Sequence, residues 1–196
     1  MIGQDVRPPL DGDRLAETLP PDAEVGGLIV VGSHVALTTR QLEYLVADQQ
    51  PHEVEVDVEQ VLGADKGTYL SGVADDVVEH LRSGNVVLRT SRELVRGRDG
   101  DDSLRIARSV SDAVVQVVRR TLAAARPRFV IAKGGITSSD VAAHGLQIGR
   151  AVVRGPMLPG IVSLWEPIDG PAVGIPTSFS PATSAMTHPW RSSPGS

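Results

Sequence analysis

The fold is decided by residues 128–145, which read RFVIAKGGITSSDVAAHG. The first five residues form a short run rich in apolar and β-branched side chains, which is typical of a buried parallel strand. Gly134 and Gly135 then permit a sharp turn, and the helix-compatible run that follows ends at Gly145. The stretch therefore predicts a strand, a glycine turn and a helix.

The glycine turn is a candidate phosphate-binding site. Because they lack Cβ atoms, Gly134 and Gly135 let the backbone approach a ligand, and Thr137 or Ser138 is expected to cap the helix. Backbone N–H groups and the helix dipole attract phosphate at such a position, and Lys133 would add a positive charge. A Gly-Gly turn also occurs in α/β proteins for geometric reasons alone, so both interpretations stand at this point.

The rest of the chain alternates strands and helices. Apolar runs predict strands at residues 27–31, 54–58, 85–89, 149–153 and 161–165, and helical spacing predicts helices at residues 38–48, 73–82 and 104–125. Loops are expected at residues 63–72, 96–102 and 155–160. This order predicts one α/β domain, a layered and mostly parallel sheet with flanking helices, as in Rossmann-like nucleotide-binding domains.

Three further polar positions have two interpretations each. Ser33, at the end of the first strand, could hydrogen-bond a nucleotide or close a turn. Residues 90–93 could bind an anion or cap the next turn. Asp140 could complete a helix cap with Thr137 or hold Mg²⁺ beside phosphates.

Composition excludes several classes of function. The 196 residues carry a net charge of −5, with 41% hydrophobic and 22% charged residues, so no basic surface favours a nucleic-acid partner. The lack of cysteine excludes disulfides and thiolate metal sites, and the five histidines show no ligand spacing, so no metal site is predicted. No run approaches the ~20 apolar residues of a membrane span, and no signal peptide is recognisable. We therefore expect a cytoplasmic protein without a membrane partner.

Several separate motifs, in one order along the chain, resemble a known family. They lie at residues 27–34 with 38–42, at 90–93, at 133–140, and at 159–161 with 164–165. Over residues 26–176 they resemble the C-terminal nucleotide-binding domain of the four-carbon acid sugar kinases. The resemblance implies ATP-dependent phosphorylation of acids such as threonate, erythronate or their oxo forms, with Mg²⁺. It also implies that Ser33, Gly134, Gly135, Ile136 and Thr137 contact ATP.

Two departures from the family pattern qualify this expectation. The family carries an N-terminal domain that binds the sugar acid, whereas the proline-containing residues 1–26 suit a linker or lead-in. The chain is therefore expected to be a fragment, a nucleotide-binding domain over residues 27–176 that phosphorylates nothing alone. The family also has a further glycine turn after Pro176, which a one-base shift of the reading frame would restore here. We therefore expect residues 177–196 to be a disordered, out-of-frame tail, which sequencing the gene would test.

Two other classes of function are compatible with parts of the sequence. A non-catalytic module that binds a nucleotide or a phosphorylated metabolite would need the same glycine turn. A dinucleotide-dependent oxidoreductase is disfavoured because no G-x-G-x-x-G follows the first strand. A homo-oligomer is compatible with each of these functions.

Overall fold

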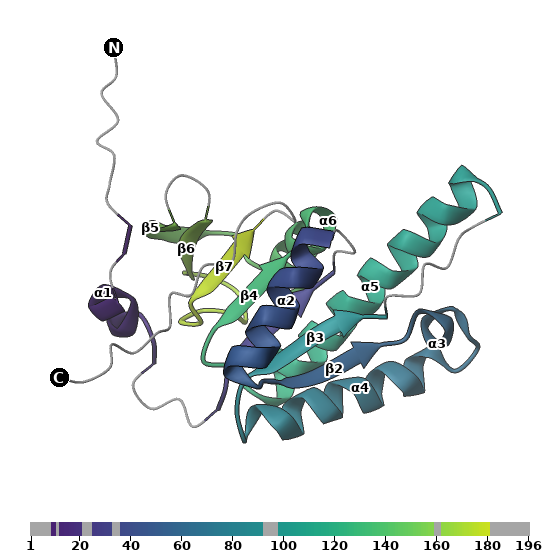
Figure 1. The fold of residues 1–196 in the computed structure, drawn as a ribbon, viewed down its shortest axis with the longest axis horizontal. Coiled ribbons are helices and arrows are strands. Elements are labelled where there is room, and N and C mark those ends of the chain that lie inside the picture. The colour runs from purple at the N-terminus through teal and green to yellow at the C-terminus, as the bar shows by residue number, and fades with distance from the viewer. Residues whose placement is uncertain are drawn as a thin grey trace, which may run out of the picture.

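The strand β1 (Leu28–Val31) lies inside a seven-stranded sheet in the computed structural model, which describes residues 9–10, 12–20, 25–32, 36–91, 98–158 and 162–180 (Figure 1). All four β1 side chains are buried, and β3 and β4 flank β1 in parallel. A parallel strand with two neighbours must be covered on both faces. The sequence pattern of β1 therefore requires helices on both sides of the sheet.

The elements follow the predicted α/β order. The remaining strands are β2 (His52–Val56), β3 (Val86–Thr90), β4 (Val130–Lys133), β5 (Ala151–Leu158), β6 (Val162–Pro167) and β7 (Thr177–Ser180). The helices are α1 (Gly12–Glu17), α2 (Ala36–Gln49), α3 (Val58–Leu62), α4 (Lys66–Leu81), α5 (Gly100–Ala124) and α6 (Gly135–Asp140), followed by the π-helical segment η1 (Val141–Gly145). The strand order is β2-β3-β1-β4-β7-β6-β5. The first five strands pair in parallel, and β6 pairs antiparallel with both β7 and β5. The predicted layered, mostly parallel sheet is confirmed.

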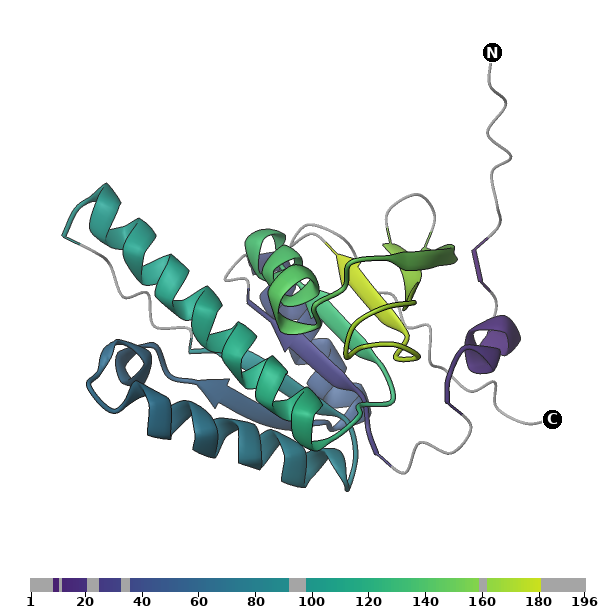
Figure 2. The same cartoon turned by 180° about the vertical axis from the view of Figure 1, so that it is seen from behind.

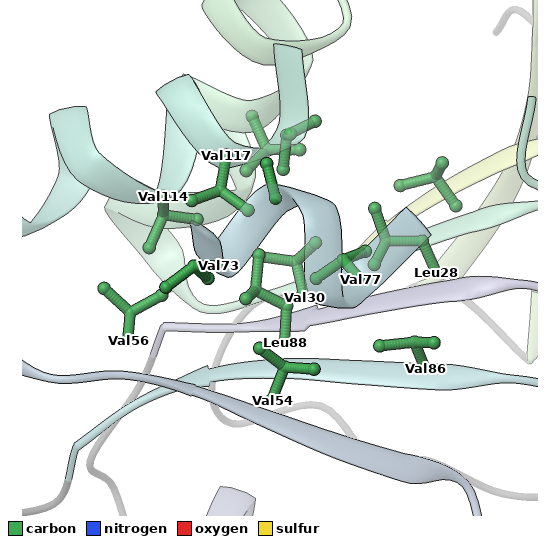
Figure 3. Packing of buried hydrophobic residues seen from close by; sticks show 14 of the residues in the cluster. Leu28, Val30, Val54, Val56, Val73, Val77, Val86, Leu88, Val114 and Val117 are labelled. Carbon is green, nitrogen blue, oxygen red and sulfur yellow. The ribbon is translucent and has the colours of Figure 1, made fainter. Parts of the chain in front are cut away.

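Helices cover the two faces of the sheet unequally. On one face, β1 to β4 contribute buried residues to a large core with α4, α5 and η1. Figure 3 shows Val30 and Leu88 of the sheet pointing toward Val77 of α4 and Val117 of α5. On the other face, a smaller cluster joins β1 and β3 to Leu42 of α2. Figure 1 shows α2 in front of the sheet, and the reverse view in Figure 2 brings α5 and α6 forward.

Helix α4 begins earlier than the sequence predicts, so the loop expected at residues 63–72 is confirmed for residues 63–65 and wrong for residues 66–72. Gly67 and Gly72 lie inside α4, where each glycine costs about 1 kcal/mol relative to alanine. The helix nevertheless buries several apolar side chains, Leu70 and Val73 among them, and each contributes about 1.5–3 kcal/mol. Tertiary packing therefore outweighs the two glycines.

Helix α5 is only half covered by the sheet. Its N-cap Asp99 accepts a hydrogen bond from the backbone N–H of Asp102 at 2.8 Å, so the helix starts within the loop predicted at residues 96–102. The predicted apolar stripe included Leu104 and Ala107, but both are exposed, because the N-terminal half of α5 extends beyond the sheet (Figure 1). Among the described helices, none combines the length and apolarity needed to cross a bilayer.

Residues 155–158 belong to β5, so the rigid loop predicted at residues 155–160 is wrong for its described part. The β5–β6 ladder shifts register between Val153 and Gly155 and again between Pro156 and Leu158. Gly155 has a φ of +153°, which glycine adopts without strain. Because β5 is an edge strand, these bulges accommodate glycine and proline without ending the pairing.

The two predicted terminal segments are partly ordered into the fold. Thr177–Ser180 form β7 between β4 and β6, and Thr177 is completely buried. For these four residues the expected disordered tail is wrong, whereas residues 181–196 lie outside the described part. The expected linker at residues 1–26 contains α1, and Leu15 and Leu19 are buried there. The reading-frame hypothesis stays a prediction.

We predict that β7 is required to hold β5 and β6 against the rest of the sheet. A chain that ends at Pro176 should lose at least about 3 kcal/mol of unfolding free energy, since several hydrogen bonds of about 0.5–1.5 kcal/mol each disappear. A chain that ends at Ser180 is the matched control and should keep nearly all of the wild-type stability. Urea denaturation followed by circular dichroism measures both, and equal midpoints would contradict the role given to β7.

Candidate functional site

The carboxyl ends of β1 and β4 lie side by side at one edge of the sheet. Val31 pairs with Lys133 in the parallel register. After β1 the chain passes into α2 on one face of the sheet and returns as β2. After β4 it passes into α6 and η1, whose Val141 joins the core of the opposite face, and returns as β5 to β7 on the other side. Neighbouring strands whose connections leave in opposite directions form a topological switch point, where open α/β sheets bind ligands.

Gly134 makes the turn from β4 into α6. Its φ of +127° and ψ of +144° lie in a region that L side chains rarely adopt. Its N–H donates to the carbonyl of Ser180 in β7 at 3.1 Å, and its carbonyl accepts from the N–H of Ser138 at 3.0 Å. The glycine therefore ties the strand ladder to the first turn of α6.

Gly32, directly after β1, brings α6 close to the sheet. A Cβ on Gly32 would lie 2.0 Å from Oγ1 of Thr137, so no larger residue fits under this helix. The Thr137 hydroxyl donates to the Gly32 carbonyl at 3.3 Å, and the Gly32 N–H donates to the Lys133 carbonyl at 3.1 Å. Thr137 is thus buried against β1 and does not cap α6, contrary to the sequence prediction.

The first turn of α6 faces open space. The N–H that Ser138 donates to Gly134 opens the hydrogen-bond ladder, so the amides of Gly135, Ile136 and Thr137 precede it. A Cβ on Gly135 would meet nothing within 4 Å, and the Ile136 side chain is 72% exposed. Amides at a helix start, at the positive end of the helix dipole, suit an anion.

Lys133, the last residue of β4, is enclosed by the protein. Its side chain is fully buried, and burial lowers the pKa of its ammonium group. Strand alternation places Lys133 on the same face as Ile131, which packs in the α2 cluster, and opposite Ala132. The sequence predicted that Lys133 adds a charge beside a bound phosphate, and that role stays a prediction for a side chain that the structure shows buried.

Comparison with known families decides what kind of domain surrounds this turn. The family described as nucleotide-binding C-terminal domain matches residues 28–179, most of the chain and all of the sheet. The chain belongs to this family. The match includes β7, so the nucleotide-binding C-terminal domain extends past the boundary predicted at residue 176. No curated protein shows significant similarity to the chain.

Solved structures share the fold of this nucleotide-binding C-terminal domain. A candidate tRNA synthase from Salmonella typhimurium LT2 superposes with a TM-score of 0.65 at 17% identity, covering 88% of this chain and 41% of its own. A domain of unknown function from Bordetella bronchiseptica, a domain-swapped dimer with bound citrate, superposes with a TM-score of 0.64 at 20% identity. This match covers 82% of this chain and 38% of the Bordetella chain. A Haemophilus influenzae protein, assigned to the same family of unknown function, superposes with a TM-score of 0.56 at 17% identity. This match covers 83% of this chain and 39% of the Haemophilus chain. The chain thus spans about two fifths of the structures it matches.

The other described candidate residues of the nucleotide-binding C-terminal domain make hydrogen bonds within the protein. Ser33 lies outside the described residues. The hydroxyl of Ser91 accepts the N–H of Val58 at 3.1 Å, which ties β3 to the start of α3. Asp140 ends α6 and accepts a hydrogen bond from the Ser111 hydroxyl of α5, so it completes no cap with Thr137. Ser138 likewise donates to the Gly135 carbonyl and does not cap the helix.

We predict opposite effects for alanine at the two adjacent glycines. Gly134→Ala should lower the free energy of unfolding by about 1–3 kcal/mol, because its backbone angles disfavour a Cβ atom. Gly135→Ala should leave stability unchanged or raise it by up to about 1 kcal/mol, since the added Cβ lies in open space within a helix. Urea denaturation of both variants measures the difference, and equal losses would contradict the described turn.

We also predict that the buried Lys133 ammonium makes stability pH-dependent. Burial lowers the pKa of Lys133 in the folded state below its ordinary value of 10.5, so the folded protein loses this proton at a lower pH than the unfolded chain. The free energy of unfolding therefore rises with pH between the folded-state pKa and 10.5. Lys133→Met removes the titrating group and should lose this rise, so the gap in unfolding free energy between wild type and Lys133→Met should change as pH approaches 10.5. Urea denaturation across this range measures the gap, and a constant difference would contradict the assignment.

Proposed function

We propose that the chain is the ATP-binding part of a kinase that phosphorylates four-carbon acid sugars such as threonate, erythronate or 3-oxo-tetronate. The observation that carries the proposal is the exposed helix start at Gly135, placed at the switch point between β1 and β4. Membership in a nucleotide-binding family supports a nucleotide at this edge of the sheet. The kinase activity and its acceptor rest on the resemblance of the sequence motifs.

In this proposal the amides of Gly135, Ile136 and Thr137 bind the phosphates of ATP. Ile136 and Thr137 contribute their backbones, because the Thr137 hydroxyl is used by Gly32 and the Ile136 side chain is apolar. Phosphoryl transfer depends mainly on positioning and charge stabilisation, so a fixed row of donors is a suitable contribution from this domain. Ser33, the second residue after β1 in the sequence, is proposed as a further contact.

Mg²⁺ would enter such a site with the nucleotide. Asp140 is the acidic residue nearest in sequence to the glycine turn, but its carboxylate accepts from Ser111 on α5. Mg²⁺ in kinase sites keeps several water ligands and binds substrate phosphates with one or two carboxylates. We assign no ligand of the described chain to it, and the ion would neutralise phosphate charge when bound.

The acceptor acid and any oligomer belong to the same proposal. Since the chain spans about two fifths of the structures it matches, we place sugar-acid binding on a separate domain. Self-association is proposed for the protein as well, and analytical ultracentrifugation of the chain measures it. A chain that binds ATP but transfers no phosphate when an acceptor domain is supplied would favour the non-catalytic binding module.

We predict that a negative charge at Gly135 weakens nucleotide binding without harming the fold. Gly135→Asp should weaken Mg·ATP binding at least about tenfold, because the carboxylate repels the phosphates, while an acid in the first helical turn is favourable for the helix. Gly135→Asn has the same size without the charge and should lose much less affinity. Isothermal titration calorimetry measures both variants beside wild type.

A distant glycine supplies the control for this titration. Gly72 also lies on an exposed helix position with open space around its Cβ, so Gly72→Asp adds the same charge away from the turn and should bind like wild type. The series is repeated in a chain that carries the family's glycine motif after Pro176. Equal affinity of Gly135→Asp and wild type in either background would rule out the proposed phosphate site.

A further inference from the structure

Two histidines from different elements are stacked at the opposite edge of the sheet. The rings of His52, at the start of β2, and His80, near the end of α4, have centroids 3.2 Å apart and planes 7° apart. Strand alternation explains the meeting, because His52 falls on the same face of β2 as Val54 and Val56, which pack against α4. The core therefore fixes both backbones from which these imidazoles project.

Asp76 determines which ring nitrogen of His80 carries the hydrogen atom. It lies one helical turn before His80 on α4, and Nδ1 of His80 is 3.0 Å from the Asp76 carboxylate and 2.9 Å from its carbonyl. Both oxygens are acceptors, so Nδ1 carries the proton and Nε2 of the neutral ring presents a lone pair. A histidine held in this way by a carboxylate is the usual arrangement of a metal-binding imidazole.

The three side chains are close enough to share one ion. Each of His52, Asp76 and His80 offers a ligand atom, and these atoms lie within 4.8 Å of one another. Tetrahedral zinc with bonds of about 2.0–2.2 Å requires ligand atoms about 3.3–3.6 Å apart, so these atoms must approach by about 1 Å. The stacked imidazole rings must also turn out of parallel, so that the lone pairs of both rings point at the ion. The cluster is reachable from solvent, since the side chains of His80 and Asp76 are 30% and 46% exposed.

The local field also favours a cation. His80 occupies the last turn of α4, where the carbonyl ends of the helix give a negative potential, and Asp76 adds a full negative charge. Two residues four apart on one helix, joined by a histidine from a neighbouring strand, repeat the spacing by which helical zinc sites collect their ligands. The sequence analysis predicted no metal site, because only the fold brings His52 next to Asp76 and His80.

We propose that His52, Asp76 and His80 form a binding site for a divalent transition metal, with Zn²⁺ as the reference ion. The imidazoles coordinate the ion, and Asp76 either supplies the third ligand or orients His80. Three protein ligands leave a position for water. The bound ion links the edge strand β2 to α4, on the side of the sheet opposite the glycine turn.

Calorimetric titration of the metal-free full chain with Zn²⁺ tests the proposal. Wild type should bind one ion, and His52→Ala and His80→Ala should each weaken binding at least about tenfold, since loss of an outer partner alone costs about 10–100-fold. Asp76→Asn should weaken it within that range. Zn²⁺ at about a hundredfold excess over Kd should raise Tm by about 5–10 °C in wild type but not in the histidine variants.

His144→Ala is the matched control, because His144 is an exposed histidine in η1 away from the cluster. It should bind Zn²⁺ like wild type. The two test histidines lie on different elements, so a folding defect in one variant, seen by circular dichroism without metal, leaves the other informative. Failure of wild type to bind Zn²⁺, or equal binding by wild type and both histidine variants, would overturn the proposal and leave the stacked rings as a surface contact.

Discussion

The close approach of α6 to the sheet is the constraint on which the candidate site depends. Gly32 leaves room for Thr137 because it has no Cβ, and Gly134 turns the chain through backbone angles that other residues avoid. Together they place the start of α6 directly above the junction of β1 and β4. A bulkier residue at either glycine would lift the helix and move its first amides away from the switch point.

The sequence predicted the local structure around the glycine turn where the determining residues are neighbours, and failed where they are distant. The run from Lys133 to Thr137 contains its own strand end, glycine turn and helix start, so the turn was predicted correctly. The partner of the Thr137 hydroxyl, Gly32, lies 105 residues earlier, so a local cap was the only interpretation available. The burial of Lys133 could not be predicted from its neighbours in sequence, because it depends on how the helices cover the sheet.

The same distinction explains the fold as a whole. β-branched runs predicted the parallel strands, whereas glycine and proline were given too much weight as signals of loops. Gly67 and Gly72 are tolerated in α4 because its other face is buried, and Pro156 is tolerated in β5 because that strand is at an edge. Helix α5 connects α4 with α6. The Ser111 hydroxyl of α5 donates a hydrogen bond to the Asp140 carboxylate of α6, and Arg120 of α5 donates to the Ser71 hydroxyl of α4 at 2.7 Å.

The position of β7 has a consequence for the order in which the protein can fold during synthesis. β5 and β6 leave the ribosome before β7, yet β7 lies between them and β4. The hairpin therefore lacks its neighbouring strand until the last described strand emerges, and until then the edge of β6 stays unpaired. Pairing of β4 with β7 spans more than forty residues of chain, so completion of the sheet should be a late, slow event after the β1–β4 half has formed.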